Sequence, residues 1–341
     1  PACCPAGAAA REMLITAAAN RWSVPSTELT TELSYVQHNA SGRSLSFGEL
    51  AADAALLEPP KNPSLKDRSQ FNIMGKAISR NDIPAKVDGS AMYGLDAHSA
   101  DMLYAAIKIT PVFGSKLVSV DATEALAQRG VKQVIELEDS VAVVADNYWR
   151  AKKALELVNA TFEESEFDKV SSADIAARFD RELAGSNGST DKEVGDTEAA
   201  LEEAADVIDA SYRVPYLAHA AMEPMNCTAV VEADRCEVWT GTQYQSNDRT
   251  VVARLLGLPE SSVTINRTLM GGSFGRRASK SADYVTDAVQ AAQGEGRPVQ
   301  IIWSREEDIR GGHYRPLFVH RLRGALDSAG YPLAWHQTVV G

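Results

Sequence analysis

The chain has 341 residues, of which 45% are hydrophobic and 23% are charged. This length exceeds what one small domain needs and the composition is that of ordinary globular proteins, so we expect two or three domains. The formal charge of −12 argues against a protein that coats DNA or RNA, because binding a phosphate backbone requires a basic surface. A local basic pocket is still compatible with this charge.

No apolar run approaches the roughly 20 residues that cross a membrane, and no leader with a basic head and an apolar core is visible. We expect the chain to be a piece of a larger protein, since PACCPAG stands directly before a predicted helix and Gly341 directly follows the apolar LAWHQTVVG. Cys3, Cys4, Cys227 and Cys236 lack the spacing of a zinc site or a disulfide framework. We interpret them as buried or incidental thiols.

The first 66 residues predict a helical and irregular segment. Residues 8–22 are rich in strong helix formers and predict a helix. Ser46 and Glu49 have the spacing of a capping box, so a short helix should begin there. The proline-rich PPKNPS from Pro59 predicts a linker.

Residues 71–164 predict a compact α/β unit in which strands alternate with helices. Asp121 and Gly130 bound one expected helix, and a second should start near Asp146. Such alternation favours a mixed or parallel sheet covered on a face. The expected strands are 102–110, 131–137 and 140–146.

A helix at 171–179 and a polar connection at 182–196 precede a second α/β series, so we predict an α/β fold in two main units. In chain order, the second series has expected strands at 207–214, 227–233 and 235–241, a helix at 246–259, a strand at 262–269, a helix at 280–293 and a strand at 298–304.

The stretch MGGSFGRR at 270–277 lies between a predicted strand and a predicted helix. Its glycines permit positive φ and close approach of a ligand to main-chain N–H groups. A strand-to-helix turn directs several such donors at one point, which suits an anion or an oxo group, and two arginines add fork-shaped donors. The spacing matches neither the dinucleotide fingerprint nor a Walker loop. A tight turn with solvated arginines is the alternative.

Three further groups accompany this loop. Glu223 in MEPMNCTA, taken singly, is expected to be a structural hydrogen-bonding carboxylate. Gln243 in GTQYQ ends a strand, where ligands gather in α/β sheets, although a lone Gln there usually pins a loop. WSREEDI at 303–309 is expected to form a salt-bridged or solvated network. The residues alone support an anionic-cofactor site at 271–277 with Gln243 as a neighbour.

In this order and spacing, MEPMNCTA, GTQYQ, MGGSFGRR and WSREEDI resemble the molybdopterin-binding large subunit of the xanthine dehydrogenase and aldehyde oxidase family. The most similar branch is that of the isoquinoline 1-oxidoreductase beta subunit and membrane-linked aldehyde dehydrogenases. The stretch from MGKAISRNDIPAKVDG to VAVVADNYWRAKKAL resembles the family's α/β hammerhead domain.

The resemblance implies four regions and a cofactor site. The regions are an N-terminal segment at 1–66, the hammerhead domain at 67–166, a linker at 167–195 and the first part of the molybdopterin-binding domain at 196–341. Gln243 would hydrogen-bond an oxo ligand of the molybdenum, and the main chain of Gly272–Gly275 would line the molybdenum side. The implied cofactor-binding residues are Gln243, Gly271, Gly272, Ser273, Phe274, Gly275, Arg276 and Arg277. We infer that the two arginines contact the pterin or its phosphates.

The resemblance also implies an oxidoreductase that hydroxylates an N-heteroaromatic or aldehyde substrate with oxygen from water. Its cofactor would be molybdopterin in the cytosine dinucleotide form. The dithiolene of the pterin would bind the molybdenum, and no protein side chain would be a metal ligand. Implied partners are the remainder of the large subunit, an iron–sulfur subunit with two 2Fe–2S clusters, a cytochrome c subunit and a small-molecule substrate. The implied location is the bacterial periplasm or membrane, with the cytoplasm as the alternative.

Two departures from the family pattern bear on activity. Where xanthine-oxidising members have a glutamate after the loop, this chain has Ala278 and Ser279, which argues against a purine substrate. The family's general-base glutamate is expected beyond Gly341, so we predict no catalytic residue in this stretch and no turnover by it alone. The alternatives are a non-catalytic piece of a split or degenerate homologue and an unrelated nucleotide-binding α/β protein. The unrelated nucleotide-binding protein would be favoured if Gln243 and Gly272 lay far apart in space.

Overall fold

The computed structural model describes residues 3–185 and 188–341. The chain divides after Val87 into two compact units. Pro1 and Ala2 at the start of PACCPAG, Ser186 and Asn187 in the predicted connection, and the side chain of Cys3 lie outside the described part. Of the described helices, none has the length and apolarity that crossing a membrane requires.

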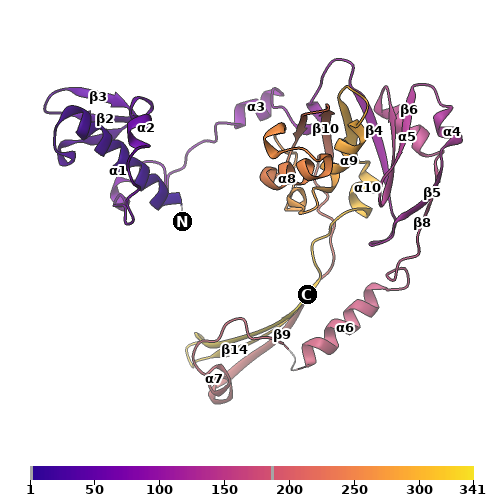
Figure 1. Ribbon diagram of the computed structural model, residues 1–341. Coiled ribbons are helices and arrows are strands. Elements are labelled where there is room, and N and C mark those ends of the chain that lie inside the picture. Colours follow the sequence, from indigo (N-terminus) through magenta and orange to yellow (C-terminus); the bar gives the residue numbers. More distant parts are fainter. Residues whose placement is uncertain (1–2, 186–187) are drawn as a thin grey trace. The chain divides into compact units, whose positions relative to one another are not determined.

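The first unit packs one long helix against a short helix and a small sheet (Figure 1, indigo). The predicted first helix is confirmed, although it begins before Ala8. The capping box is also confirmed, since Ser46 Oγ accepts from the Glu49 N–H at 3.2 Å and Glu49 Oε2 accepts from the Ser46 N–H at 2.8 Å. The elements are α1 (Cys3–Trp22), β1 (Thr30–Glu32), β2 (Tyr35–His38), β3 (Arg43–Ser46) and α2 (Phe47–Ala54), and α3 (Ile83–Asp88) lies at the division.

The second unit contains a mixed sheet of seven strands in the order β12-β11-β10-β13-β4-β7-β6. Most of its residues are short or β-branched and buried, as in a sheet covered by helices. The strands are β4 (Leu103–Ile109), β6 (Val131–Glu136), β7 (Ser140–Ala145), β10 (Asn226–Val231), β11 (Cys236–Thr240), β12 (Val263–Arg267) and β13 (Val299–Ile302).

The central pairing of this sheet joins the two predicted α/β units. β13 lies parallel to β4, with Val299 opposite Leu103, and antiparallel to β10. The expected mixed sheet is confirmed, but the two units do not have separate sheets. Hydrophobic patterning identifies strands without showing which ones pair over such a distance in sequence, so this pairing was not predicted.

Helices cover both faces of the seven-stranded sheet. α8 (Gln245–Leu256) and α9 (Asp283–Ala292) contribute to a core with Cys227, Val238 and Ile301 on one face. On the other face, α5 (Tyr148–Leu155) packs on β4 and β7. Figure 1 shows α8 and α9 on the β10 side and α5 beside β6. Cys227 and Cys236 are buried, and burial raises the pKa of the Cys236 thiol to about 11.

The helix expected between Asp121 and Gly130 is the main local error. Only α4 (Thr123–Leu126) forms, and Asp121 accepts from the Thr123 N–H at 3.0 Å in a turn before it. Gly130 takes a φ of 87° and its carbonyl accepts from the Asp146 N–H, so the chain turns into β6. The sheet pairing of β6 therefore ends the helix early.

A separate three-stranded sheet has the order β15-β14-β9. α6 (Ser172–Ala184) confirms the helix expected at 171–179 and lies within the predicted linker, whereas α7 (Thr197–Glu203) follows the predicted polar connection, where no helix was expected. Both helices pack on this sheet. β5 (Leu117–Asp121) and β8 (Asn159–Phe162) form a fourth small sheet. The remaining elements are α6 (Ser172–Ala184), α7 (Thr197–Glu203), β9 (Asp206–Val214), α10 (Arg305–Arg310), β14 (Phe318–Leu326) and β15 (Pro332–Val340).

Candidate functional site

The glycine-rich loop at 271–277 connects β12 to the segment before α9. Gly272 and Gly275 have φ angles of 104° and 103°, and Phe274 has a φ of 57°. Gly271 is required for a different reason, because a Cβ there would lie 2.4 Å from the Glu223 Cβ. The sequence interpretation of bare, positive-φ glycines is therefore confirmed for Gly272 and Gly275, and Gly271 permits close packing.

The main chain of this loop presents a row of N–H groups. The Gly271 N–H donates to Glu223 Oε2 at 2.8 Å. The N–H groups of the next four residues, Gly272 to Gly275, have no hydrogen-bond acceptor among residues 3–185 and 188–341. A Cβ at Gly272 would lie 3.3 Å from the Ala221 Cβ. Four consecutive N–H groups of the loop are therefore free to donate, and the lack of a Cβ at Gly272 leaves space beside Ala221. We call these four N–H groups the cradle; such free donors fit an oxo or anionic group.

Gln243 lies against this cradle. Its N–H donates to the Arg277 carbonyl at 3.0 Å, and its Oε1 accepts from Ser273 Oγ. Gln243 is exposed, and its Nε2 has no acceptor in the described part of the chain, so that amide can still donate. The structure therefore brings Gln243 and the loop together, which argues against the unrelated nucleotide-binding alternative.

Arg277 is buried beneath the loop rather than solvated. Its side chain is fully buried. Nε donates to the Gly272 carbonyl at 3.1 Å, Nη1 to the Gly241 carbonyl at 3.2 Å, and Nη2 to the Glu223 carbonyl at 3.0 Å. One guanidinium group therefore ties the loop to the strand end before Gln243 and to the segment around Glu223.

Glu223 completes this anchor, as the sequence analysis expected of a structural carboxylate. It is 7% exposed, and its Oε2 lies 3.1 Å from Arg277 Nη2. Its Oε1 accepts from the Leu95 N–H at 3.0 Å, so a third segment joins the same cluster. This network is costly to break because its groups are buried. Each group would lose its hydrogen-bond partner, and no water could replace that partner.

Arg276 is also buried and points away from solvent. Its Nη2 pairs with Asp283 Oδ2 at 2.6 Å, its guanidinium lies 5.2 Å from the Trp303 ring centroid, and Gly312 packs directly on it. Carbonyls and carboxylates of the chain therefore accept hydrogen bonds from both guanidinium groups. Contact of Arg276 and Arg277 with the pterin or its phosphates remains a prediction.

WSREEDI forms the expected salt-bridged network around α10. Arg305 Nη1 lies 2.9 Å from Asp308 Oδ2, and the same guanidinium donates to the carbonyls of Ala221 and Met222, both at 2.8 Å. Glu307 accepts from the Ile109 N–H at 2.9 Å. α10 therefore supports the segment that carries Glu223.

Asp248 was not among the residues predicted from the sequence. Thr242 Oγ1 donates to Asp248 Oδ2 at 2.5 Å and, in turn, accepts from the Tyr244 N–H, which shapes the turn around Gln243. Burial raises the pKa of Asp248 to about 6, and its bond to Thr242 lowers it in part. The signal that could have identified Asp248 is an acidic residue among the buried positions of α8.

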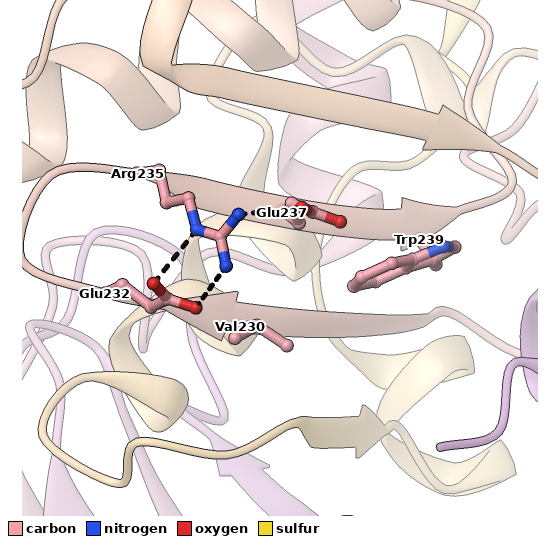
Figure 2. Close-up of a pocket in the computed structure, with 5 residues that line it drawn as sticks. All are labelled: Val230, Glu232, Arg235, Glu237 and Trp239. Atoms are coloured by element: carbon pink, nitrogen blue, oxygen red, sulfur yellow. Dashed lines mark hydrogen bonds and ion pairs between the residues drawn. The ribbon is translucent and has the colours of Figure 1, made fainter.

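Two hollows lie apart from the cradle. One, of about 160 Å³, lies on the β10–β11 hairpin and is lined by Val230, Glu232, Arg235, Glu237 and Trp239 (Figure 2). Arg235 pairs there with Glu232 at 2.7 Å, so the charges neutralise each other. The other, of about 230 Å³, lies beside Asp283 and Gly312. No residue of the 271–277 loop lines either hollow, so the loop remains the candidate site.

The chain is similar to a known cofactor-binding domain and to named oxidoreductases. Residues 181–341 match the molybdopterin cofactor-binding domain. The chain is 31% identical to the isoquinoline 1-oxidoreductase subunit beta of Brevundimonas diminuta, over 94% of this chain and 46% of that protein. It is 32% identical to a membrane-bound aldehyde dehydrogenase of Gluconacetobacter polyoxogenes, over 95% of this chain and 44% of that protein. The chain belongs to the molybdopterin-binding subunits of the xanthine dehydrogenase and aldehyde oxidase family.

Solved structures support the same fold. Quinoline 2-oxidoreductase from Pseudomonas putida 86 matches with a TM-score of 0.61 and 21% identity, over 78% of this chain and 39% of that one. The aldehyde oxidoreductase of Desulfovibrio gigas matches with a TM-score of 0.61 and 19% identity, over 76% of this chain and 33% of that one. The predicted α/β fold class is confirmed. The chain spans about half the length of the curated relatives it matches.

The relatives are oxidoreductases, several named as subunits of larger enzymes. In this chain, Ala278 and Ser279 directly follow the loop. Ala278 is exposed, and the Ser279 hydroxyl lies 2.7 Å from that of Ser281. No carboxylate stands at these two positions. The predicted domain boundaries at 66, 166 and 195 remain predictions, although the shared sheet shows that residues on both sides of 167–195 fold together.

Proposed function

We propose that this chain holds the molybdenum cofactor of a hydroxylase that oxidises an N-heteroaromatic compound or an aldehyde. The observation that carries the proposal is the cradle, in which four consecutive N–H groups without acceptors adjoin the Gln243 amide. When bound, the cofactor would supply the two-electron redox chemistry and the oxygen derived from water.

The residues of the chain would position and polarise this group. The Gly272–Gly275 N–H groups would donate to oxo or pterin oxygens, and Gln243 Nε2 would donate to an oxo group. The buried pair of Arg277 and Glu223 would hold these donors in place and does not depend on a ligand. Such preorganisation costs no rearrangement at the moment of reaction.

The substrate class is proposed from two supports. Ala278 and Ser279 leave the position after the loop without an acidic group, which suits substrates less polar than purines. The names of the relatives include isoquinoline, nicotinate and aldehyde oxidoreductases. The reaction would replace a substrate C–H by C–OH with water as the source of oxygen, releasing two electrons and two protons.

The two released electrons require an acceptor, and the resemblance to the family suggests the remaining parts of the enzyme. We propose a small subunit with two 2Fe–2S clusters as the electron acceptor, a cytochrome c subunit after it, and a general-base glutamate supplied by the rest of the large subunit. The proposed cofactor form is molybdopterin cytosine dinucleotide, and the proposed location is the periplasm or the membrane of a bacterium.

Metal and pterin analysis of the enzyme, purified with its bound subunits, tests this function. We expect about one molybdenum per large subunit, an oxidised pterin released by acid, and CMP after hydrolysis. Four iron atoms per assembly, in addition to one for each haem of a bound cytochrome, would support the two-cluster partner. Absence of both molybdenum and pterin would refute the proposal and favour a non-catalytic homologue.

A further inference from the structure

The three-stranded sheet β15-β14-β9 has two chemically different faces. Its register places Tyr212, His320 and Val339 side by side. Successive residues of a strand point to opposite faces, so alternate residues share one face. We call this the open face; it consists of Asp206, Ile208, Ala210, Tyr212, Val214, Phe318, His320, Leu322, Gly324, Leu326, Leu333, Trp335, Gln337 and Val339.

The opposite face is covered by helices and carries the charges. Asp180 of α6 pairs with Arg213 at 2.5 Å, and Glu198 of α7 pairs with His336 at 2.9 Å. Val319 and Ala325 are buried on this side, at 1% and 0% exposure. Figure 1 shows β9 and β14 as long strands with α7 beside them. The ordinary arrangement, with apolar residues beneath helices and polar residues outside, is therefore reversed.

The open face is apolar and uncovered. Trp335 and Leu333 are each 60% exposed, and Ile208 and Tyr212 are each 56% exposed. Of its fourteen residues, only Asp206, at one end of β9, is Asp, Glu, Lys or Arg. A contiguous apolar surface of this kind marks a place where another polypeptide or a membrane binds.

We propose that, in the assembled enzyme, a further segment of the same large subunit covers the open face. The curated relatives continue well beyond the matched stretch, which is only 46% and 44% of their lengths. Three strands of nine residues give a footprint of roughly 400 Å², well below the ~800 Å² that each partner contributes to a standard independent interface. A tethered segment can bind so small a surface because its effective concentration is high.

Two other occupants fit less well. A second copy would offer the same small footprint without the tether. A membrane surface attracts basic side chains, but Arg213, Arg321 and Arg323 lie on the opposite face and pair there with acidic groups. The proposal depends on the proposed function only in taking the assembled enzyme as its setting.

Site-specific labelling of the purified assembled enzyme tests whether the face is covered. Gln337→Cys places a thiol on the open face, and Ser328→Cys places one in the exposed turn between β14 and β15. Peptide mass spectrometry after maleimide treatment distinguishes both from the native cysteines. We expect Gln337→Cys to react at least ten times more slowly than Ser328→Cys, and equal rates would overturn the proposal.

Photo-crosslinking identifies the occupant. With p-benzoylphenylalanine in place of Trp335, we expect a crosslink to a peptide of the same polypeptide outside residues 1–341. A crosslink to the 206–341 region of an isotopically labelled second copy, to a separate subunit, or to lipid would overturn the assignment. Molybdenum content measured on the same samples reports separately on the proposed function, because the open face contains no cradle residue.

Discussion

The carboxylate of Glu223 and the guanidinium of Arg277 lie 3.1 Å apart, and both side chains are almost completely buried beneath the cofactor loop. Glu223→Ala would leave Arg277 charged without its partner and the Gly271 N–H without its acceptor. We expect a loss of about 3 kcal/mol in the free energy of unfolding, measured by urea denaturation.

The exposed pair of Glu232 and Arg235 supplies the control, since Glu232→Ala should cost much less, because solvent screens this pair. If the two substitutions cost the same, Glu223 does not anchor the loop.

Gln243→Ala removes the side-chain donor beside the cradle without disturbing the main-chain bond to Arg277. We expect the complete enzyme to retain its molybdenum while kcat falls by about 100-fold, the effect of losing one donor to a developing oxyanion. Gln245→Ala, at the exposed start of α8, is the control and should leave kcat unchanged. Wild-type turnover in Gln243→Ala would refute the role assigned to this amide.

Gly272→Val should prevent cofactor insertion. The substitution adds a side chain at a φ of 104°, against Ala221, in the cradle itself. Gly257→Ala is a matched control, because Gly257 also has a positive φ, 67°, but has open space around it at the end of α8. We expect molybdenum below a tenth of the wild-type content in Gly272→Val and full content in Gly257→Ala. Full occupancy in both would argue that the cofactor does not bind at this loop.

Asp248 gives a pH-dependent prediction. Burial raises its pKa to about 6 in the folded state from 3.8 in the unfolded state. The folded state therefore binds the proton more tightly, and this group's contribution to stability is present below pH 4 and is lost as the pH rises to about 6. Asp248→Asn should be more stable than wild type at pH 7.5, by on the order of 2 kcal/mol, and similar near pH 4. Urea unfolding at both pH values checks this, and an advantage independent of pH would contradict it.

Much of the fold could be predicted from local patterns. Alternating apolar residues predicted the strands of the seven-stranded sheet, and Ser46 with Glu49 predicted the start of α2. The glycines at 272 and 275 predicted positive φ angles. These features depend on residues close in sequence, which a single sequence displays directly.

The fate of the arginines could not be predicted in this way. Whether Arg277 faces solvent or the interior depends on carbonyls at Gly241 and Glu223, which only the fold brings to it. The parallel pairing of β13 with β4 could not be predicted either, because it also joins segments that only the fold brings together. Asp248 was missed because its partner Thr242 belongs to a turn whose shape the sequence does not specify.

The position of β13 constrains when the site can form during synthesis. β12, β11 and β10 form one side of the sheet, β4, β7 and β6 the other, and β13 lies between them although it is the last of the seven to be translated. Until residues 299–302 leave the ribosome, each half-sheet ends in an unpaired edge, of the kind that associates with other chains. Leu95, which precedes β4, donates to Glu223, which precedes β10, so this hydrogen bond links the two half-sheets. We therefore expect the donor cradle to form only after β13 has paired, and cofactor insertion to follow that pairing.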